Sequence, residues 1–307
     1  MNNPYYSVII PVFNEAENIG PLHKELVLVM KGLNRAFEII VVDDGSTDTT
    51  FQELKKLKSL KVIRLRRNYG QSTALNAGIK ASHGEIIITL DGDGQNDPAD
   101  IPLLLQKMGE GFDVVCGWRY ERKDTDFRKF ISSGAAFLRR FLVDDGIHDA
   151  GCTLRAYRRE CFEDLELYAE FHRMIPALLK WRGFSLTEIK VHHRPRCFGT
   201  TKYTGKRVLK GFVDMLYIWF WRKYAARPMH LFGGTGIALI SIGSSMAIGL
   251  AILRIFFGFE LHDRIWPLVA FFLILTGFQF LISGFMAADL VENSNRKKYY
   301  IREMIEQ

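Results

Sequence analysis

Residues 85–95 read EIIITLDGDGQ: a run of β-branched residues typical of a buried strand, followed at once by a glycine-containing turn with two carboxylates. Segments with a helical pattern, such as 19–33, 49–57 and 71–81, lie between this run and similar ones along the chain. The other runs before residue 118 are YSVIIPVF, FEIIVVDD, KVIRLRR and FDVVCG. This alternation predicts an α/β fold with a mostly parallel sheet and helices on both faces.

Acidic side chains follow two of these runs, at the strand ends where parallel sheets bind ligands. Asp91 and Asp93 are one residue apart and could share a divalent cation such as Mg²⁺ or Mn²⁺, although a DxD with glycine is also an ordinary turn. Asp44 could accept hydrogen bonds from a base or a ribose, or could cap a helix beginning near residue 47 or 48. No GxxxxGK[ST] sequence occurs, and Asp97 stands where a dinucleotide fingerprint needs its third glycine, which argues against both of those nucleotide folds.

The composition of the 307 residues excludes several classes of protein. With 48% apolar and 24% charged residues, the chain is neither a disordered polar tail nor a multi-span transporter. Its net charge of +7 suits anionic lipid or phosphate, and we expect no nucleic-acid partner because no nucleic-acid module occurs. The start, MNNPYYSVIIPVF, lacks the features of a signal peptide, and the cysteines form no CxxC pair, so we expect a cytosolic N-terminal part with free thiols.

Apolar residues concentrate late in the chain. Residues 231–253 and 266–288 contain no charged residue, and each would be ~35 Å long as a helix, enough to cross a bilayer. Helices buried in a soluble core are the alternative, but such helices normally carry a polar face. Only residues 258–265 separate the two spans, which predicts a tight hairpin. Basic residues flank its outer ends, so both termini are predicted to be cytosolic.

The segments 126–143 and 206–228 mix aromatic and basic residues, and both are typical of helices in the headgroup layer of a lipid bilayer. An ordinary surface helix explains the first equally well. We therefore predict a domain over 1–204, a juxtamembrane amphipathic segment over 205–229, a hairpin over 230–289 and a cytosolic tail over 290–307.

Seven motifs occur in the order typical of one enzyme family: SVIIPVFNEAENI, EIIVVDDGSTDTT, RRNYGQSTALNAGIKASHGEIIITLDGDGQNDPADIP, DVVCGWRY, GCTLRAYRRE, EFHRMIPALL and HHRPRCFGTTKY. Together they resemble the family 2 glycosyltransferases of GT-A fold, and within them the polyprenyl-phosphate sugar synthases, most closely the bacterial undecaprenyl-phosphate enzymes. The resemblance implies a Rossmann-like GT-A domain and a membrane-anchored, inverting enzyme. Such an enzyme moves one sugar from a UDP- or GDP-sugar to undecaprenyl or dolichyl phosphate. The resemblance implies that the enzyme is located in the bacterial inner membrane, with the ER membrane as an alternative. It leaves open whether the enzyme forms a homo-oligomer.

The resemblance also implies roles for individual residues. The nucleotide would be held by Pro11, Phe13, Glu15, Val42, Asp44, Asp91, Gly92 and Asp93, and the metal by Asp91, Asp93 and Gln95. The acceptor phosphate would be contacted by Arg119, Arg128 and Ser132, the pyrophosphate by Arg196 and Lys202, and Asp149 would lie near the reacting centre. Phe13 replaces the usual Tyr, and Trp118 stands where Ser is usual.

The chemistry of this family requires no side chain that acts as a base. A lipid phosphomonoester has a second pKa of about 6 and is therefore largely ionised at neutral pH. The protein must orient this nucleophile and stabilise the departing diphosphate, which calls for cations. A processive polysaccharide synthase would need a QxxRW motif, which is absent. A catalytically silent membrane scaffold or nucleotide-sugar sensor of the same fold is the remaining alternative.

Overall fold

The computed structural model describes residues 3–119, 146–163, 165–167, 171–195, 220, 223–224, 228–261 and 264–292. These residues fall into two compact units, one within Met1–Met215 and one within Leu216–Lys297. The predicted amphipathic segment 126–143 and most of 206–228 lie outside the described residues.

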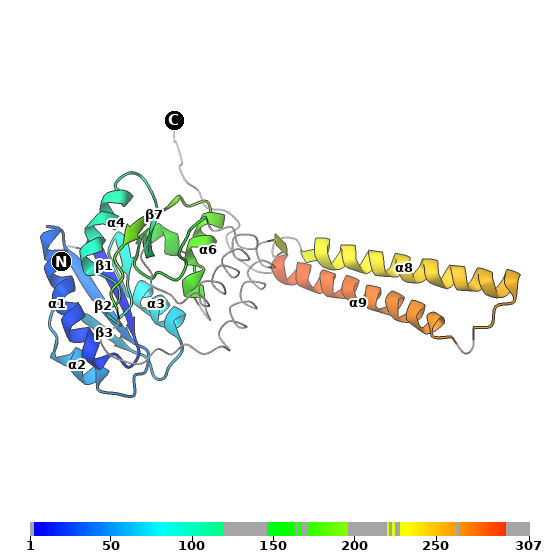
Figure 1. Ribbon diagram of the computed structural model, residues 1–307, viewed down its shortest axis with the longest axis horizontal. Helices are drawn as coiled ribbons and strands as arrows, with labels where there is room; N and C mark the ends of the chain where they lie inside the picture. The colour runs from blue at the N-terminus through cyan, green and yellow to red at the C-terminus, as the bar shows by residue number, and fades with distance from the viewer. Residues whose placement is uncertain are drawn as a thin grey trace. The chain divides into compact units, whose positions relative to one another are not determined.

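A seven-stranded sheet in the order β3-β2-β1-β4-β6-β5-β7 forms the centre of the first unit (Figure 1). The strands are β1 (Tyr6–Val12), β2 (Phe37–Asp43), β3 (Lys61–Arg64), β4 (Ile86–Thr89), β5 (Val114–Arg119), β6 (Arg155–Arg158) and β7 (Leu186–Val191). Only β6 runs antiparallel to its neighbours, which confirms the mostly parallel sheet. Each predicted run forms a strand, whereas β6 and β7 were not predicted.

Helices cover both faces of this sheet, as the alternation predicts. They are α1 (Ala16–Gly32), α2 (Thr50–Lys56), α3 (Gln71–Lys80), α4 (Ile101–Met108) and α6 (Ile175–Trp181), with short 3₁₀ turns η1 (Pro98–Asp100), η2 (Arg159–Phe162) and η3 (Phe171–Arg173). Successive side chains of a strand point to opposite faces. Val8 and Ile10 of β1 accordingly pack with α1 and α4, while Ile9 packs with α3 and α6. Burial of both faces explains why these strands are apolar throughout.

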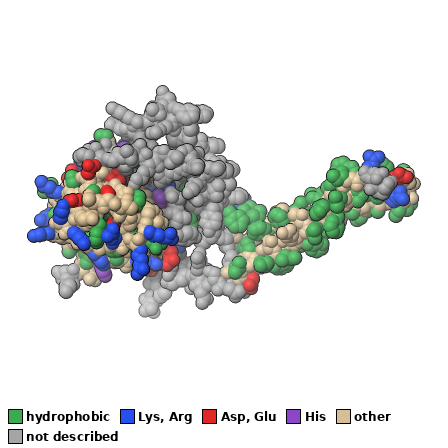
Figure 2. Space-filling model, turned by 90° about the horizontal axis from the view of Figure 1, so that it is seen from below, with side chains coloured by type: hydrophobic (Ala, Val, Ile, Leu, Met, Phe, Trp, Pro, Cys, Tyr) green, Lys and Arg blue, Asp and Glu red, His purple; other side chains and the backbone are tan. Residues whose placement is uncertain are grey.

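The second unit contains two long helices, α8 (Pro228–Phe257) and α9 (Trp266–Glu292), which include the predicted spans. Both are long and apolar enough to cross a membrane. Their large apolar side chains are mostly exposed, including Ile255, Phe271 and Phe285, and hydrophobic side chains cover the helix pair (Figure 2). This exposure is the opposite of what core helices of a soluble protein show, and it favours lipid as their surroundings.

Glycines bring α8 and α9 together. A Cβ atom added at Gly236 would lie 2.7 Å from the carbonyl oxygen of Gly277, and one added at Gly277 would lie 2.7 Å from that of Gly236. One added at Gly243 would lie 2.9 Å from the carbonyl oxygen of Ala270. Because such distances are too short for any side chain, glycine at these positions permits the close backbone approach that apolar helices use in membranes.

Candidate active site

The acidic loop, residues 91–96, leaves the carboxyl end of β4 and lies against β1. A Cβ atom at Gly92 would collide with the Val12 side chain, so only glycine fits there. The backbone N–H of Asp91 donates to Asn96 Oδ1 at 3.0 Å, and the N–H of Gln95 donates to Asp93 Oδ1 at 3.1 Å. These bonds hold both carboxylates within one short turn.

The two carboxylates of this loop fit a divalent cation. Burial, together with the neighbouring charge of Asp93, raises the pKa of Asp91 to about 6, although Gln71 Nε2 donates to Asp91 Oδ1 at 2.7 Å. A cation between the carboxylates would remove their repulsion, and carboxylate and amide oxygens are the ligands that Mg²⁺ and Mn²⁺ prefer. Among the described residues no group of three His, Cys, Asp or Glu side chains could hold a metal. Two carboxylates leave coordination positions for substrate phosphate and water.

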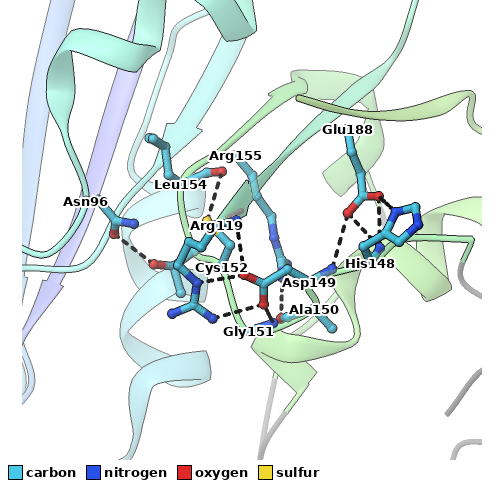
Figure 3. Close-up of polar contacts among 11 residues, drawn as sticks. Asn96, Arg119, His148, Asp149, Ala150, Gly151, Cys152, Leu154, Arg155 and Glu188 are labelled. Carbon is cyan, nitrogen blue, oxygen red and sulfur yellow. Dashed lines mark hydrogen bonds and ion pairs between the residues drawn. The ribbon is translucent and has the colours of Figure 1, made fainter. Parts of the chain in front are cut away.

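Arg119 and Asp149 form a two-point ion pair beside this loop (Figure 3). Arg119, the last residue of β5, donates from Nε to Asp149 Oδ2 at 2.7 Å and from Nη2 to Oδ1 at 2.9 Å. Their side chains are only 14% and 16% exposed. Burial acts to raise the pKa of Asp149, but the hydrogen bonds and charge of Arg119 outweigh it and hold that pKa below its usual value.

Asn96 and Thr153 join the acidic loop to the turn that contains Asp149. Asn96 Oδ1 accepts the Asp91 N–H and also the Thr153 hydroxyl, at 3.1 Å. Thr153 and the charge of Arg119 both act to lower the pKa of Asp91. The structure therefore places a carboxylate pair that suits a cation next to an oriented guanidinium, a combination suited to substrates that carry several phosphate charges.

Asp44 has a different structural role from the predicted helix cap. Its Oδ1 accepts the Tyr69 N–H at 2.8 Å and its Oδ2 accepts the Gly70 N–H at 2.9 Å, which fixes β2 to the start of α3. The first turn of α2 is instead satisfied by Asp48, whose Oδ1 accepts the Thr50 N–H at 2.9 Å. The cap interpretation of Asp44 is therefore wrong, because the segment that precedes α3 lies closer to this carboxylate than α2 does.

Residues 7–166 match the family described as glycosyl transferase family 2. The chain belongs to this family. This glycosyltransferase is 33% identical to a dodecaprenyl-phosphate galacturonate synthase of Rhizobium johnstonii, over 98% of this chain and 93% of the relative. It is 34% identical to an undecaprenyl-phosphate 4-deoxy-4-formamido-L-arabinose transferase of Pseudomonas fluorescens, over 92% of this chain and 84% of the relative. The resemblance to bacterial polyprenyl-phosphate glycosyltransferases is confirmed.

Solved structures share the fold of this glycosyltransferase. Glucosyl-3-phosphoglycerate synthase from Mycobacterium tuberculosis, in complex with Mn²⁺, uridine diphosphate and glucosyl-3-phosphoglycerate, has a TM-score of 0.54 at 18% identity. The match covers 71% of this chain and 80% of that chain. The predicted fold class, a GT-A-like α/β domain followed by two apolar helices, is confirmed.

The strand ends of β1, β2 and β4 bring most of the predicted nucleotide residues of this glycosyltransferase to one edge of the sheet. Pro11 of β1 pairs with Val42 of β2, and Phe13 and Glu15 follow β1 directly. Glu15 Oε2 accepts from Asn18 Nδ2 at 2.7 Å. The side chain of Val42, by contrast, is fully buried in an apolar cluster with Ile40 and Ala74.

Four predicted site residues, Arg128, Ser132, Arg196 and Lys202, lie outside the described residues. Conversely, the structure adds residues that sequence reasoning missed: Asn96 and Thr153 in the loops, and Glu188 on β7. The sequence signal for Glu188 is the alternation of polar and apolar residues from Glu188 to Val191, within β7. This stretch is too short to predict a strand with a defined partner.

Proposed function

We propose that this glycosyltransferase moves one sugar, with inversion at the anomeric carbon, from a UDP- or GDP-sugar to a polyprenyl phosphate at the cytosolic face of the bacterial inner membrane. One observation carries the proposal: the similarity to relatives named for polyprenyl-phosphate acceptors spans both the catalytic domain and the two apolar helices. A polyprenyl phosphate keeps its chain in the bilayer and its phosphate at the surface. An enzyme that uses it needs a membrane anchor next to a soluble catalytic site.

The donor would be bound at the strand ends of β1, β2 and β4. Asp91, Asp93 and Gln95 would hold Mg²⁺ or Mn²⁺, and a bound cation supplies positive charge that stabilises the departing diphosphate. A solved structure of the same fold was obtained with Mn²⁺ and uridine diphosphate, which supports a divalent cation in a site of this fold. Phe13 would stack on the nucleotide, while Pro11, Glu15 and Asp44 would line its site.

The acceptor would be bound by cations next to this donor site. Because the phosphate of the acceptor is already ionised at neutral pH, the protein has to orient it and does not have to deprotonate it. Asp149 holds Nε and Nη2 of Arg119, and within the described part of the chain no hydrogen bond involves Nη1. Arg119 therefore presents a fixed guanidinium with one free edge to a phosphate. Arg128 and Ser132 would complete the acceptor site, and Arg196 and Lys202 would bind the pyrophosphate.

The two apolar helices would cross the membrane as a hairpin with both chain ends in the cytosol. Lys and Arg residues are more numerous before α8 and after α9 than in the short connection between the helices. Under the positive-inside rule, this difference supports the orientation. The segment 205–229 would lie in the headgroup layer. The proposed units are thus a catalytic domain over 1–204, this juxtamembrane segment, the hairpin over 230–289 and a cytosolic tail over 290–307.

Mass spectrometry of the lipid product tests this function. Purified full-length protein in detergent is mixed with polyprenyl phosphate, Mn²⁺ or Mg²⁺ and a panel of UDP- and GDP-sugars. We expect one sugar-phosphate lipid that is absent with EDTA and with Asp93→Asn, and present with the surface control Glu110→Gln. A folded protein that binds nucleotide but forms no lipid product from any donor would contradict the proposal and favour the silent scaffold.

A further inference from the structure

Glu188 of β7 binds the backbone of the turn that precedes β6, and no sequence motif pointed to it. Both of its carboxylate oxygens lie 2.8 Å from the His148 N, and Oε1 also accepts the Asp149 N–H at 3.3 Å. His148 Nδ1 lies 2.7 Å from Oε2, and the side chain of Glu188 is only 10% exposed (Figure 3). A carboxylate this buried needs several donors, and here the main chain of two consecutive residues supplies most of them.

The turn bound by Glu188 is the one that places Asp149 next to Arg119. β7 pairs in parallel with β5, so Glu188 lies opposite Cys116 while Arg119 lies opposite Val191 at the end of the same strand pair. Glu188 thus holds the backbone of Asp149 from β7, while Arg119 holds its carboxylate from β5. The turn is fixed at both its main chain and its side chain.

We infer that Glu188 is a positioning residue for the acceptor-binding guanidinium: it fixes the backbone at His148 and Asp149, and thereby the orientation that Asp149 imposes on Arg119. This inference rests on the proposed function, in which Arg119 binds the acceptor phosphate. In this role Glu188 acts through Asp149 and Arg119 and needs no contact of its own with the substrate. Its effect follows from geometry, because a displacement of about 1 Å in a group that orients a reactant can lower a rate about 100-fold.

Kinetics of three full-length variants in detergent test this role: Glu188→Ala, Glu188→Gln and the exposed control Glu166→Gln. We expect Glu188→Ala to lower kcat/KM for polyprenyl phosphate about 10- to 100-fold, while KM for the nucleotide-sugar stays within about 2-fold. Gln retains one acceptor oxygen, so Glu188→Gln should recover part of the loss. Glu166→Gln should behave as wild type.

A double-mutant cycle separates positioning from a general loss of stability. If Glu188 acts through Arg119, adding Glu188→Ala to Arg119→Ala should lower the remaining activity by less than about 3-fold. Amide hydrogen exchange gives a readout that does not depend on turnover. In Glu188→Ala, the amides of His148 and Asp149 should exchange faster, while the Gly117 amide, which donates to Leu154 O, should not change.

The outcomes distinguish the two proposals. Suppose that the wild type is active. If Glu188→Ala then lowers kcat/KM by the same factor in the presence and in the absence of Arg119, or leaves amide exchange at His148 and Asp149 unchanged, the role of Glu188 is overturned and the proposed function still stands. A wild type that forms no lipid product overturns the proposed function, and with it the catalytic consequence of this role.

Discussion

The guanidinium of Arg119 binds the carboxylate of Asp149 edge-on through two hydrogen bonds of 2.7 and 2.9 Å, and this pair joins the end of β5 to the turn before β6. Such a fork sets both the direction and the plane of the guanidinium. Arg119 also lies near the acidic loop after β4, where its charge acts on Asp91. The ion pair therefore holds the guanidinium beside the two carboxylates that suit a metal ion.

Replacing Arg119 by Lys keeps the charge but removes the fork, since an ammonium group is a point charge. We expect Arg119→Lys to lower kcat/KM for polyprenyl phosphate at least about 10-fold and to leave nucleotide affinity unchanged. Steady-state kinetics with each substrate varied separately measures this. Equal losses for both substrates would contradict an acceptor-specific role for Arg119.

Adding Mn²⁺ should raise the melting temperature of the wild-type protein, because a ligand that binds only the folded state stabilises it, by about 2.7 kcal/mol at 100 times its Kd. In Asp93→Asn the shift should disappear, while in Glu110→Gln it should persist. A thermal melt followed by intrinsic fluorescence, with and without EDTA, measures the effect. An unchanged Mn²⁺ shift in Asp93→Asn would show that the cation binds elsewhere.

Gly92→Ala should displace the acidic loop from β1, because the added methyl group would overlap the Val12 side chain. We expect loss of the Mn²⁺-induced thermal shift and a stability loss of about 1–3 kcal/mol from overpacking. Gly20→Ala is the matched control, since a Cβ atom at Gly20 in α1 meets nothing within 4 Å and alanine favours a helix by about 1 kcal/mol. Similar behaviour of both variants would contradict the close approach of the loop to β1.

Gly277→Ala should weaken the packing of α8 against α9, because its methyl group would lie 2.7 Å from the carbonyl oxygen of Gly236. Gly249→Ala, where nothing lies within 4 Å, should leave the helix pair unchanged. Melting temperatures of the two purified proteins in one detergent compare them directly. A Gly277→Ala protein as stable as Gly249→Ala would mean that the helices do not pack through these glycines.

Inversion predicts the configuration of the product. The anomeric carbon should have the opposite configuration in the sugar-phosphate lipid and in the nucleotide-sugar donor, which the proton coupling constants of both compounds report by NMR. Retained configuration would require a different chemical course.

Local patterns in the sequence were sufficient for the parallel sheet, the acidic turn at Asp91 and Asp93, and the two apolar helices. Each of these depends on neighbours a few residues apart: a β-branched run forms a strand, and a long uncharged run forms a helix suited to lipid. β6, Arg155–Arg158, was missed because it contains no β-branched residue, whereas the equally short β3 and β4 lie in β-branched runs.

The partners of the polar side chains could not be predicted in this way, because only the order and register of the strands bring these side chains together. Arg119 and Asp149 are 30 positions apart, and His148 and Glu188 are 40 apart, so no local pattern could pair them. Asp44 binds the backbone at Tyr69 and Gly70 because their loop lies next to β2, and Val42 faces the interior because side chains alternate along its strand. Hydrophobic periodicity is encoded among neighbours in the chain, whereas a polar contact between distant segments exists only after the sheet has set their positions.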